Sequence, residues 1–555
     1  MALVRAHISC TLREKGISND SVFQGTDCLT CVIGDMMNST TGANSQGNAN
    51  LSEIVQIDNG SLRGIPRNPQ GVLAFLGIPH SAAPVGELRW QAPQAPRPWE
   101  GVRDATRVGN RCWVNVPETG LGGRVGTVPQ SEDCLYLNVW TAAQSSAERR
   151  PVLVWIHGGG FQFGTGLDPR TDGTRLAEKG VIVVSVNYRL GVFGFFAHPQ
   201  LRTEGRLSGN FGILDQISAL KWVQANIANF GGDPKYVTIF GESSGSQSVS
   251  LLMGSPLAKG IFHRAIGQSG SSLQDIPSVA EIGLRGAAYA SALGAKTLAD
   301  LRAMPAERIN AAAAWDFTGG APVIFAPGVD GHVIPENMVE VFRKGNQNDV
   351  PLLAGYNKAE EFPFLAETLP HRTAAEFLAA AQHIFGAAKM REFEALYPSN
   401  TDAEAKVAAG ELHGDIRQKA ESWLWLSLHS RTGKSAVYGY HLAYESPYTP
   451  VASHGADLPL VFGNLVPQFF APKAPPAGPE DRALSNTMMA YWVNFAAKGD
   501  PNGPGLPQWP EFRADNSLLQ IEGGGRITAN PPAERQIARF RFLDGFLISA
   551  SSGQQ

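Results

Sequence analysis

The sequence predicts an α/β fold in which a central, mostly parallel, twisted β-sheet carries helices on both faces. The first observation is a series of apolar, β-branched runs, which are typical of strands buried on both faces of a parallel sheet. These runs lie at 151–157 (PVLVWIH), 181–189 (VIVVSVNYR), 236–240 (YVTIF), 350–357 (VPLLAGYN) and 435–444 (SAVYGYHLAY). The second observation is a helical repeat of apolar residues between the second and third runs, formed by Ile213, Ile217, Leu220, Val223 and Ile227. Strands that alternate with helices favour a parallel sheet.

The chain after Leu51 contains no linker, repeat or block of charge, so we expect one continuous domain over residues 51–550, with large helical insertions. Residues 36–53 are rich in Asn, Gly, Ser and Thr, a composition typical of a flexible segment. We therefore expect residues 1–50 to be a flexible leader, or an artefact of start assignment if Met36 or Met37 is the true start. This leader lacks the apolar stretch of a secretory signal, which favours a cytoplasmic location.

The charge balance and the lack of long apolar runs disfavour two broad classes of function. The 46 basic and 50 acidic residues give a net charge of −4, and no dense Lys/Arg tract is present that would follow a phosphate backbone. No run of about 18 apolar residues occurs, so we expect no transmembrane segment. The apolar content of 43% is ordinary for a globular chain with a large core. Nucleic-acid binding and membrane spanning are therefore disfavoured.

The stretch GESSG at 241–245 follows one predicted strand and precedes a segment able to start a helix. Small residues at both ends permit a tight strand-to-helix turn that lifts the middle side chain above the sheet edge, the setting of a nucleophilic serine. In the G-x-S-x-G register that residue is Ser243, while Ser244 supplies a backbone N–H. Ser246 and Ser248 then fall at the helix start and are expected to be structural.

A second glycine-rich stretch, HGGGF at 157–161, follows the first predicted strand. Consecutive glycines let backbone N–H groups turn inward and bind the negative charge that develops on an ester carbonyl oxygen. The expected oxyanion hole consists of the amides of Gly159, Gly160 and Ser244. His157 is expected to be a hydrogen-bonding residue at the loop base rather than a catalytic base.

With these motifs in place, the chain resembles the type B carboxylesterases, the group of the α/β-hydrolase fold that includes carboxylesterases, cholinesterases and bacterial p-nitrobenzyl esterases. The resemblance runs from about Ile54 to Phe546 and rests on several blocks in their usual order. Those blocks are FLGIPHSAAPVGELRW, SEDCLYLNVW, WIHGGGFQFG, VNYRLGVFGF, GNFGILDQISALKWVQANIANFGGDPKYVTIFGESSG, FHRAIGQSG, GVDGHVIPE and YWVNFAAKGDPNGPGLPQWPEF. It implies a serine esterase that needs no metal or organic cofactor, with an ester and water as its reactants.

The resemblance also implies the other two members of a catalytic triad. The block LLAGYNKAEEFPF resembles the family's GxNxxEG, which points to Glu360 as the acid. The family usually has glycine at the next position, where this chain has Glu361, so Glu361 remains the alternative acid. The block SHGADLPLVFG resembles the family's histidine block and makes His454 the base. Ser243 would attack the ester as His454 takes its proton, and water would then release the acid from the acyl-enzyme.

The five cysteines fall into two groups. Cys10, Cys28 and Cys31 lie in the leader, and the CxxC spacing there lacks a second ligand pair for a metal. Cys112 and Cys134 could close a loop by a disulfide or could be two buried thiols, and spacing alone leaves both open. The resemblance favours the disulfide, which suits an exported protein and so opposes the cytoplasmic location.

Substrate identity depends on the loop between those two cysteines. In cholinesterases a tryptophan in this loop binds a quaternary ammonium group, but the corresponding position here is Arg124, and Trp113 stands elsewhere. A choline ester is therefore disfavoured. A xenobiotic ester, or an ester of a polycarboxylic acid that pairs with Arg124, is expected instead, unless this arginine is simply solvated. The alternatives are a lipase for longer-chain esters and a non-catalytic adhesion or binding protein of the same fold; the sequence leaves the oligomeric state unknown.

Overall fold

The computed structural model describes residues 50–114, 128–203, 209–313, 325–361, 373–467 and 471–552. By the density of internal contacts the chain divides into residues 1–47 and 48–555, and every described helix and strand belongs to the second unit. The predicted leader therefore lies outside the described residues, apart from Asn50. No helix within the described ranges is both long and apolar enough to cross a bilayer.

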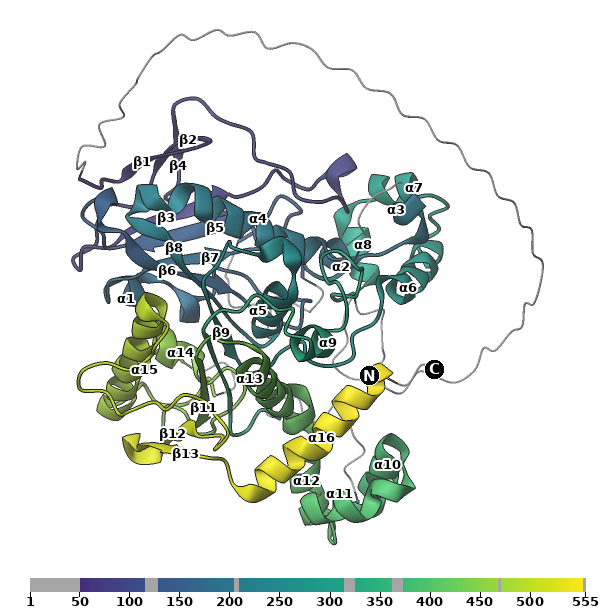
Figure 1. The fold of residues 1–555 in the computed structure, drawn as a ribbon. Coiled ribbons are helices and arrows are strands. Elements are labelled where there is room, and N and C mark those ends of the chain that lie inside the picture. The colour runs from purple at the N-terminus through teal and green to yellow at the C-terminus, as the bar shows by residue number, and fades with distance from the viewer. Residues whose placement is uncertain are drawn as a thin grey trace, which may run out of the picture. The chain divides into compact units, whose positions relative to one another are not determined.

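A ten-stranded sheet forms the centre of this unit (Figure 1). In their order across the sheet, its strands are β13 (Ile527–Asn530), β12 (Leu518–Glu522), β11 (Val437–Ala443), β10 (Leu352–Asn357), β9 (Arg264–Gln268), β8 (Gly232–Glu242), β6 (Arg150–Ile156), β7 (Ile182–Val186), β5 (Tyr136–Thr141) and β3 (Leu73–Pro79). Neighbours from β12 to β7 pair in parallel, whereas β13, β5 and β3 pair in antiparallel fashion. A separate small sheet contains β1 (Ile54–Ile57), β2 (Gly60–Arg63) and β4 (Val102–Asp104).

All five predicted strands are present, as β6, β7, β8, β10 and β11, and all lie in the parallel part of the sheet. The prediction of an α/β fold with a mostly parallel sheet is therefore confirmed. Strand β8 starts at Gly232, before the predicted run at 236–240, and includes Asp233 and Pro234. Proline is tolerated there because it lies near the start of the strand.

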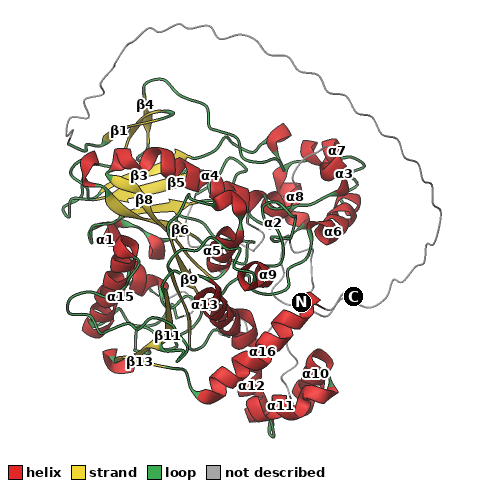
Figure 2. Ribbon diagram, viewed as in Figure 1, coloured by secondary structure: helices red, strands yellow, loops and turns green. Residues whose placement is uncertain are grey.

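Helices cover both faces of the sheet (Figure 2). The helices are α1 (Thr174–Ala177), α2 (Gly191–Phe195), α3 (Pro199–Thr203), α4 (Phe211–Asn226), α5 (Ser244–Gly254), α6 (Val279–Ala292), α7 (Leu298–Ala303), α8 (Ala306–Ala312), α9 (Met338–Arg343), α10 (Ala374–Phe385), α11 (Met390–Leu396), α12 (Asp402–Gly414), α13 (Ala420–Thr432), α14 (Leu458–Phe462), α15 (Pro479–Lys498) and α16 (Glu534–Ser552). A π-helical segment, Asp415–Lys419, joins α12 to α13. The predicted helical repeat is α4, so that prediction is also correct.

Strand β6 illustrates how the sheet is buried from both sides. Val152 and Val154 pack into one apolar cluster, which also contains residues of α4, α5 and α13. The alternate residues, Leu153 and Trp155, pack into a second cluster with residues of α1, α14 and α15. Side chains on a strand alternate between its two faces, so an unbroken apolar run is the pattern such a strand requires.

Candidate active site

The predicted site residues come together at one edge of the sheet, because parallel strands end on the same side. Ser243 directly follows β8, and Glu360 follows β10 by three residues. His454 lies on the segment after β11, and the glycine loop starts directly after β6. In open α/β sheets, ligand sites lie beyond the carboxyl ends of the strands. The described part of the chain thus places the candidate nucleophile, the candidate base, the candidate acid and the glycine loop in one region.

Ser243 occupies a strained turn between β8 and α5. Its backbone has φ 56° and ψ −123°, a conformation that costs a residue other than glycine on the order of 1–3 kcal/mol. A Cβ on Gly245 would lie 2.1 Å from the carbonyl oxygen of Ile156, and one on Gly241 would lie 2.4 Å from the carbonyl carbon of Gly245. Only glycine fits at either position, so the two glycines that flank the serine permit this turn.

The glycine loop packs directly against that turn. A Cβ on Gly158 would lie 2.5 Å from the carbonyl oxygen of Glu242 and 3.1 Å from the Cβ of Ser243, so this part of the loop must also be glycine. Gly159 and Gly160 both have positive φ, 112° and 60°. The amide of Phe161 donates a hydrogen bond of 3.2 Å to the hydroxyl of Ser244. Ser244 therefore contributes a hydroxyl that ties the loop to the turn, which the sequence did not indicate.

His157 anchors the base of the loop. Its Nδ1–H donates to the carbonyl of Gly158 at 2.9 Å, and its own carbonyl accepts from the hydroxyl of Tyr188 at 2.8 Å. The two rings stack with centroids 4.4 Å apart. Burial lowers the pKa of His157 to about 4, so the ring is neutral at physiological pH. This environment agrees with the predicted structural role.

His454 contacts Glu360 rather than Glu361. The Nδ1 atom of His454 lies 2.6 Å from Oε2 of Glu360, which is fully buried. The other carboxylate oxygen of Glu360 accepts a hydrogen bond of 2.6 Å from the amide of Asn357. The carboxylate of Glu361 lies instead against Gly414, where a Cβ would approach Glu361 Oε2 to 3.1 Å. Of the two acids, only Glu360 is in position to orient the imidazole.

A second carboxylate reaches the same histidine. Glu242 directly precedes Ser243, and its Oε1 lies 3.1 Å from Nε2 of His454. Burial raises the pKa of Glu242 to about 7, opposed by the charge of His454. Burial alone would lower the pKa of His454, but Glu242 and Glu360 outweigh it and raise that pKa to about 9. The imidazolium form is thus stabilised from both ring nitrogens.

Glu242 was not among the predicted site residues, although it lies beside the serine in the G-x-S-x-G motif. Asp457, a buried carboxylate that follows His454 by three residues, was not among them either. Asp457 accepts hydrogen bonds from Gln268 Nε2 at 2.6 Å and from the hydroxyl of Tyr440 at 2.9 Å. These bonds connect the His454 segment to β9 and β11. Because Asp457 bonds to neighbouring strands, it fixes the position of the segment that carries the histidine.

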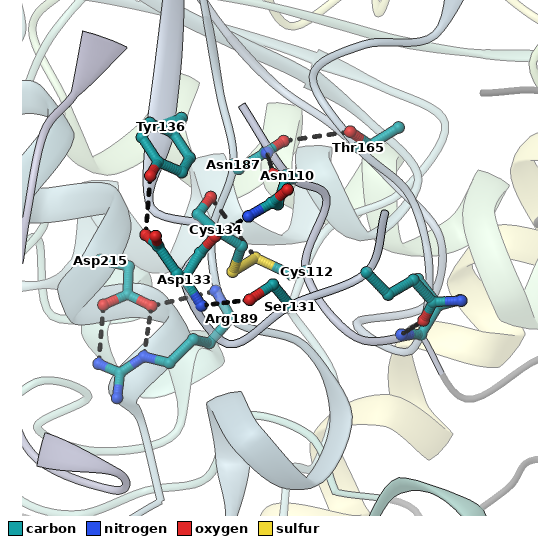
Figure 3. The surroundings of a disulfide bond; sticks show 12 residues. Asn110, Cys112, Ser131, Asp133, Cys134, Tyr136, Thr165, Asn187, Arg189 and Asp215 are labelled. Carbon is teal, nitrogen blue, oxygen red and sulfur yellow. Dashed lines mark hydrogen bonds and ion pairs between the residues drawn. A yellow bond between two sulfur atoms is a disulfide. The ribbon is translucent and has the colours of Figure 1, made fainter. Parts of the chain in front are cut away.

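The predicted disulfide between Cys112 and Cys134 is present, with Cα atoms 5.0 Å apart (Figure 3). Close by, the buried pair Arg189–Asp215 forms two hydrogen bonds of 2.8 Å, with both side chains nearly inaccessible to solvent. Charges buried this deeply require a partner, and the geometry supplies it. The predicted substrate residue Arg124 belongs to residues 115–127, which lie outside the described residues.

Comparison with known proteins defines the class to which this fold and site belong. The profile of the carboxylesterase family matches residues 51–538. A fumonisin B1 esterase of Sphingopyxis macrogoltabida is 37% identical over 473 residues, which cover 83% of this chain and 86% of the relative. A para-nitrobenzyl esterase of Bacillus subtilis is 34% identical over 493 residues, covering 87% of this chain and 98% of the relative. Pig (Sus scrofa) liver carboxylesterase is 35% identical over 501 residues, which cover 81% of this chain and 85% of the relative.

Solved protein structures point to the same class of protein. A structure of PNB esterase superposes with a TM-score of 0.76 at 33% identity, covering 87% of this chain and 99% of the other. The fold is therefore the α/β-hydrolase fold, and the chain is a carboxylic ester hydrolase. It belongs to the carboxylesterase family.

Proposed function

We propose that the chain hydrolyses carboxylic esters through an acyl-enzyme on Ser243, with His454 as the base and Glu360 as the orienting acid. The observation that carries this proposal is the 2.6 Å contact between His454 Nδ1 and Glu360 Oε2, beside the strained turn of Ser243. A carboxylate on Nδ1 fixes the tautomer in which Nε2 carries no proton and can accept one. That is the arrangement required to activate a serine hydroxyl.

The reaction then has two halves. Ser243 Oγ attacks the ester carbonyl while His454 Nε2 takes the hydroxyl proton, and the same proton is given to the departing alcohol. Water then attacks the acyl-enzyme with His454 again as base, and the carboxylic acid leaves. In this proposal the amides of Gly159, Gly160 and Ser244 bind the oxyanion in both halves. Removing one such donor typically costs about 3 kcal/mol of transition-state stabilisation.

The positive φ values of Gly159 and Gly160 support their role, because such a backbone can turn N–H groups toward the serine. The hydrogen bond from Phe161 to the hydroxyl of Ser244 supports it further, because it fixes the distance between the loop and the turn. Donors held in place before the substrate arrives need no reorganisation during the reaction, which is the main source of oxyanion stabilisation.

Relatives named for para-nitrobenzyl and fumonisin B1 esters favour a broad range of substrates that includes xenobiotic esters. A preference for an ester bearing a carboxylate would depend on Arg124. Hydrolysis of a neutral and a carboxylated p-nitrophenyl ester by wild type and Arg124→Ala tests this: a selective loss on the carboxylated ester supports the preference. Equal losses on both esters would exclude it.

The experiment that tests the proposed function is a panel of p-nitrophenyl esters of increasing acyl length, hydrolysed by wild type and by Ser243→Ala. We expect turnover of the short esters to fall by at least about 10⁴-fold in the variant, because the remaining binding groups give only weak catalysis. Activity that survives the substitution would overturn the mechanism. A rate that rises steadily with acyl length would favour the lipase alternative.

A further inference from the structure

A large cleft lies far from the catalytic edge, between α13, the start of β11 and α16. Its volume is about 930 Å³, within the range of small-molecule sites. Its lining includes Ala436 and Val437 at the amino end of β11. The catalytic residues lie beyond the carboxyl end of the sheet, and a strand of this length spans about 20 Å. The cleft is therefore a separate feature from the site proposed above.

Basic side chains outnumber acidic ones in the lining of this cleft. Arg431, Lys434 and Arg541 line it and are all exposed. Arg513, a fourth basic residue, is paired with Glu511. Against Glu511 and Asp544, the four basic residues leave the lining with a net positive charge, which attracts an anion.

One acidic residue sits among these cations. Asp544 lies on α16, and its pKa is affected by the charges of Arg431 and Arg541. Its Oδ1 atom is buried and has no hydrogen-bond partner among the described residues. Burial raises the pKa of Asp544 to about 7 against the effect of the two arginines. Even with Asp544 ionised, three cations and one anion leave two positive charges, and the protonated form can donate a hydrogen bond to a bound oxyanion.

The floor of the cleft is apolar. Trp423 of α13 and Phe512 lie beneath it, and their rings meet edge to face with centroids 5.2 Å apart. Trp423 is 4% and Phe512 2% exposed, so only a small part of each ring reaches the cleft and the rest packs in the core. Guanidinium groups bind planar carboxylates through paired N–H donors, while an apolar wall accepts a hydrocarbon body. The lining thus combines a charged rim with an apolar floor.

We propose that this cleft is a second binding site that takes a small organic carboxylate, with its anionic group held by Arg431 and Arg541 and its apolar body over the parts of Trp423 and Phe512 that reach the floor. This site is independent of the ester-hydrolysing residues. α16 lies beside α13 at this cleft (Figure 1), and the lining comes from three segments, 423–437, 511–516 and 541–544.

Isothermal titration calorimetry with 2-naphthoate tests the proposal on the full chain. We expect wild type to bind it and the double variant Arg431→Gln/Arg541→Gln to bind at least about tenfold more weakly, because charge-assisted hydrogen bonds to the carboxylate are lost. The matched control is Arg526→Gln, which removes an exposed arginine outside the cleft that is paired with Glu522. This control should bind as wild type does.

Two further ligands test separately whether the negative charge and the apolar body of the ligand are both needed. 2-Naphthamide, a neutral analogue, should bind wild type at least about tenfold more weakly than 2-naphthoate does. Inorganic phosphate should also bind wild type more weakly than 2-naphthoate. Equal binding of 2-naphthoate by wild type and the double variant would overturn the proposal, since it would place the ligand in the catalytic site or on the general surface. Equal binding of the amide, or of phosphate, would also overturn it.

Hydrolysis of p-nitrophenyl acetate provides the folding check, because the cleft lies at the opposite edge from Ser243. The double variant should keep a kcat/KM within about twofold of wild type. If the double variant does not fold, the same measurements are made on the single variant Arg541→Gln. The side chain of Arg541 is exposed, so its replacement leaves no cavity.

Discussion

Replacing Glu242 by Gln is predicted to change the pH at which the esterase becomes active. Glu242 Oε1 lies 3.1 Å from His454 Nε2, and glutamine keeps the size of the side chain while removing its charge. A nearby carboxylate favours the protonated imidazolium. Without this carboxylate, the pKa of His454 should fall.

The structure gives the approximate size of this shift. Opposite charges 4 Å apart interact by about 4 kcal/mol at an effective dielectric constant of about 20. Glu242, whose pKa burial raises to about 7, is ionised at the pH near 9 where His454 titrates, and the carbonyl oxygen of glutamine can still accept a hydrogen bond from Nε2. We therefore expect about half of this energy, about 2 kcal/mol, which corresponds to about 1.5 pKa units. The pKa of His454 should decrease by that amount from about 9.

The assay is the pH profile of kcat/KM for p-nitrophenyl acetate, whose acidic limb reports the base of the free enzyme. His454 accepts a proton only when neutral, so activity is lost as the pH falls through its pKa. In Glu242→Gln the acidic limb should move about 1.5 units toward lower pH. In the control Glu361→Gln, whose carboxylate lies against Gly414, the limb should stay in place. An unmoved limb in Glu242→Gln, or a move to higher pH, would refute this reasoning.

Three further predictions concern the acid, the disulfide and the serine turn. Glu360→Gln should lower kcat on p-nitrophenyl acetate by about 10⁴-fold, because the imidazole loses the carboxylate that fixes its tautomer. Replacing Cys112 and Cys134 together by Ser should lower the free energy of unfolding, measured in urea, by about 3 kcal/mol, because the 22-residue loop is released in the unfolded chain. Gly245→Ala should lower the melting temperature sharply, since its Cβ would lie 2.1 Å from a backbone oxygen, whereas Gly545→Ala, which meets open space, should not.

Each of these has its own contradicting result. Near-normal turnover in Glu360→Gln, with a large loss in Glu361→Gln, would move the acid to the neighbouring residue. An unchanged urea midpoint in the double serine variant would mean that the loop is restrained without the disulfide. Equal melting temperatures for the two alanine variants would contradict the tight packing inferred around Gly245.

Sequence patterns predicted the parallel sheet because its strands are long and apolar on both faces. They did not predict β3, β5 or β9, which lack an unbroken β-branched run. They also missed β12 and β13, with five and four residues, and the three-stranded sheet, in which β1, β2 and β4 have four, four and three residues. Strands with an unbroken apolar, β-branched run are thus predictable from one sequence, while the others depend on tertiary context.

In the candidate site, too, some residues could be predicted from the local sequence and others could not. Ser243 and the glycine loop were predicted from local residue types, because a tight turn and inward amides demand glycine at fixed positions. Glu360 and His454 required a family resemblance, since nothing local distinguishes one acid or histidine from the others. The contact between Glu242 and His454 could not be predicted, because it depends on how two distant loops meet above the sheet. The cleft beside α16 was unpredictable for the same reason, as three separate segments line it.

The central claim, that Ser243 is the nucleophile, is tested most directly by trapping the covalent enzyme. Wild type and Ser243→Ala are treated with diethyl p-nitrophenyl phosphate, which phosphorylates activated serines, and the digested proteins are mapped by mass spectrometry. The account predicts a single diethylphosphoryl adduct on Ser243 in wild type, formed in step with the loss of esterase activity, and no adduct in the variant. An adduct on another residue that tracks the loss of activity, or full inactivation without any adduct on Ser243, would contradict it.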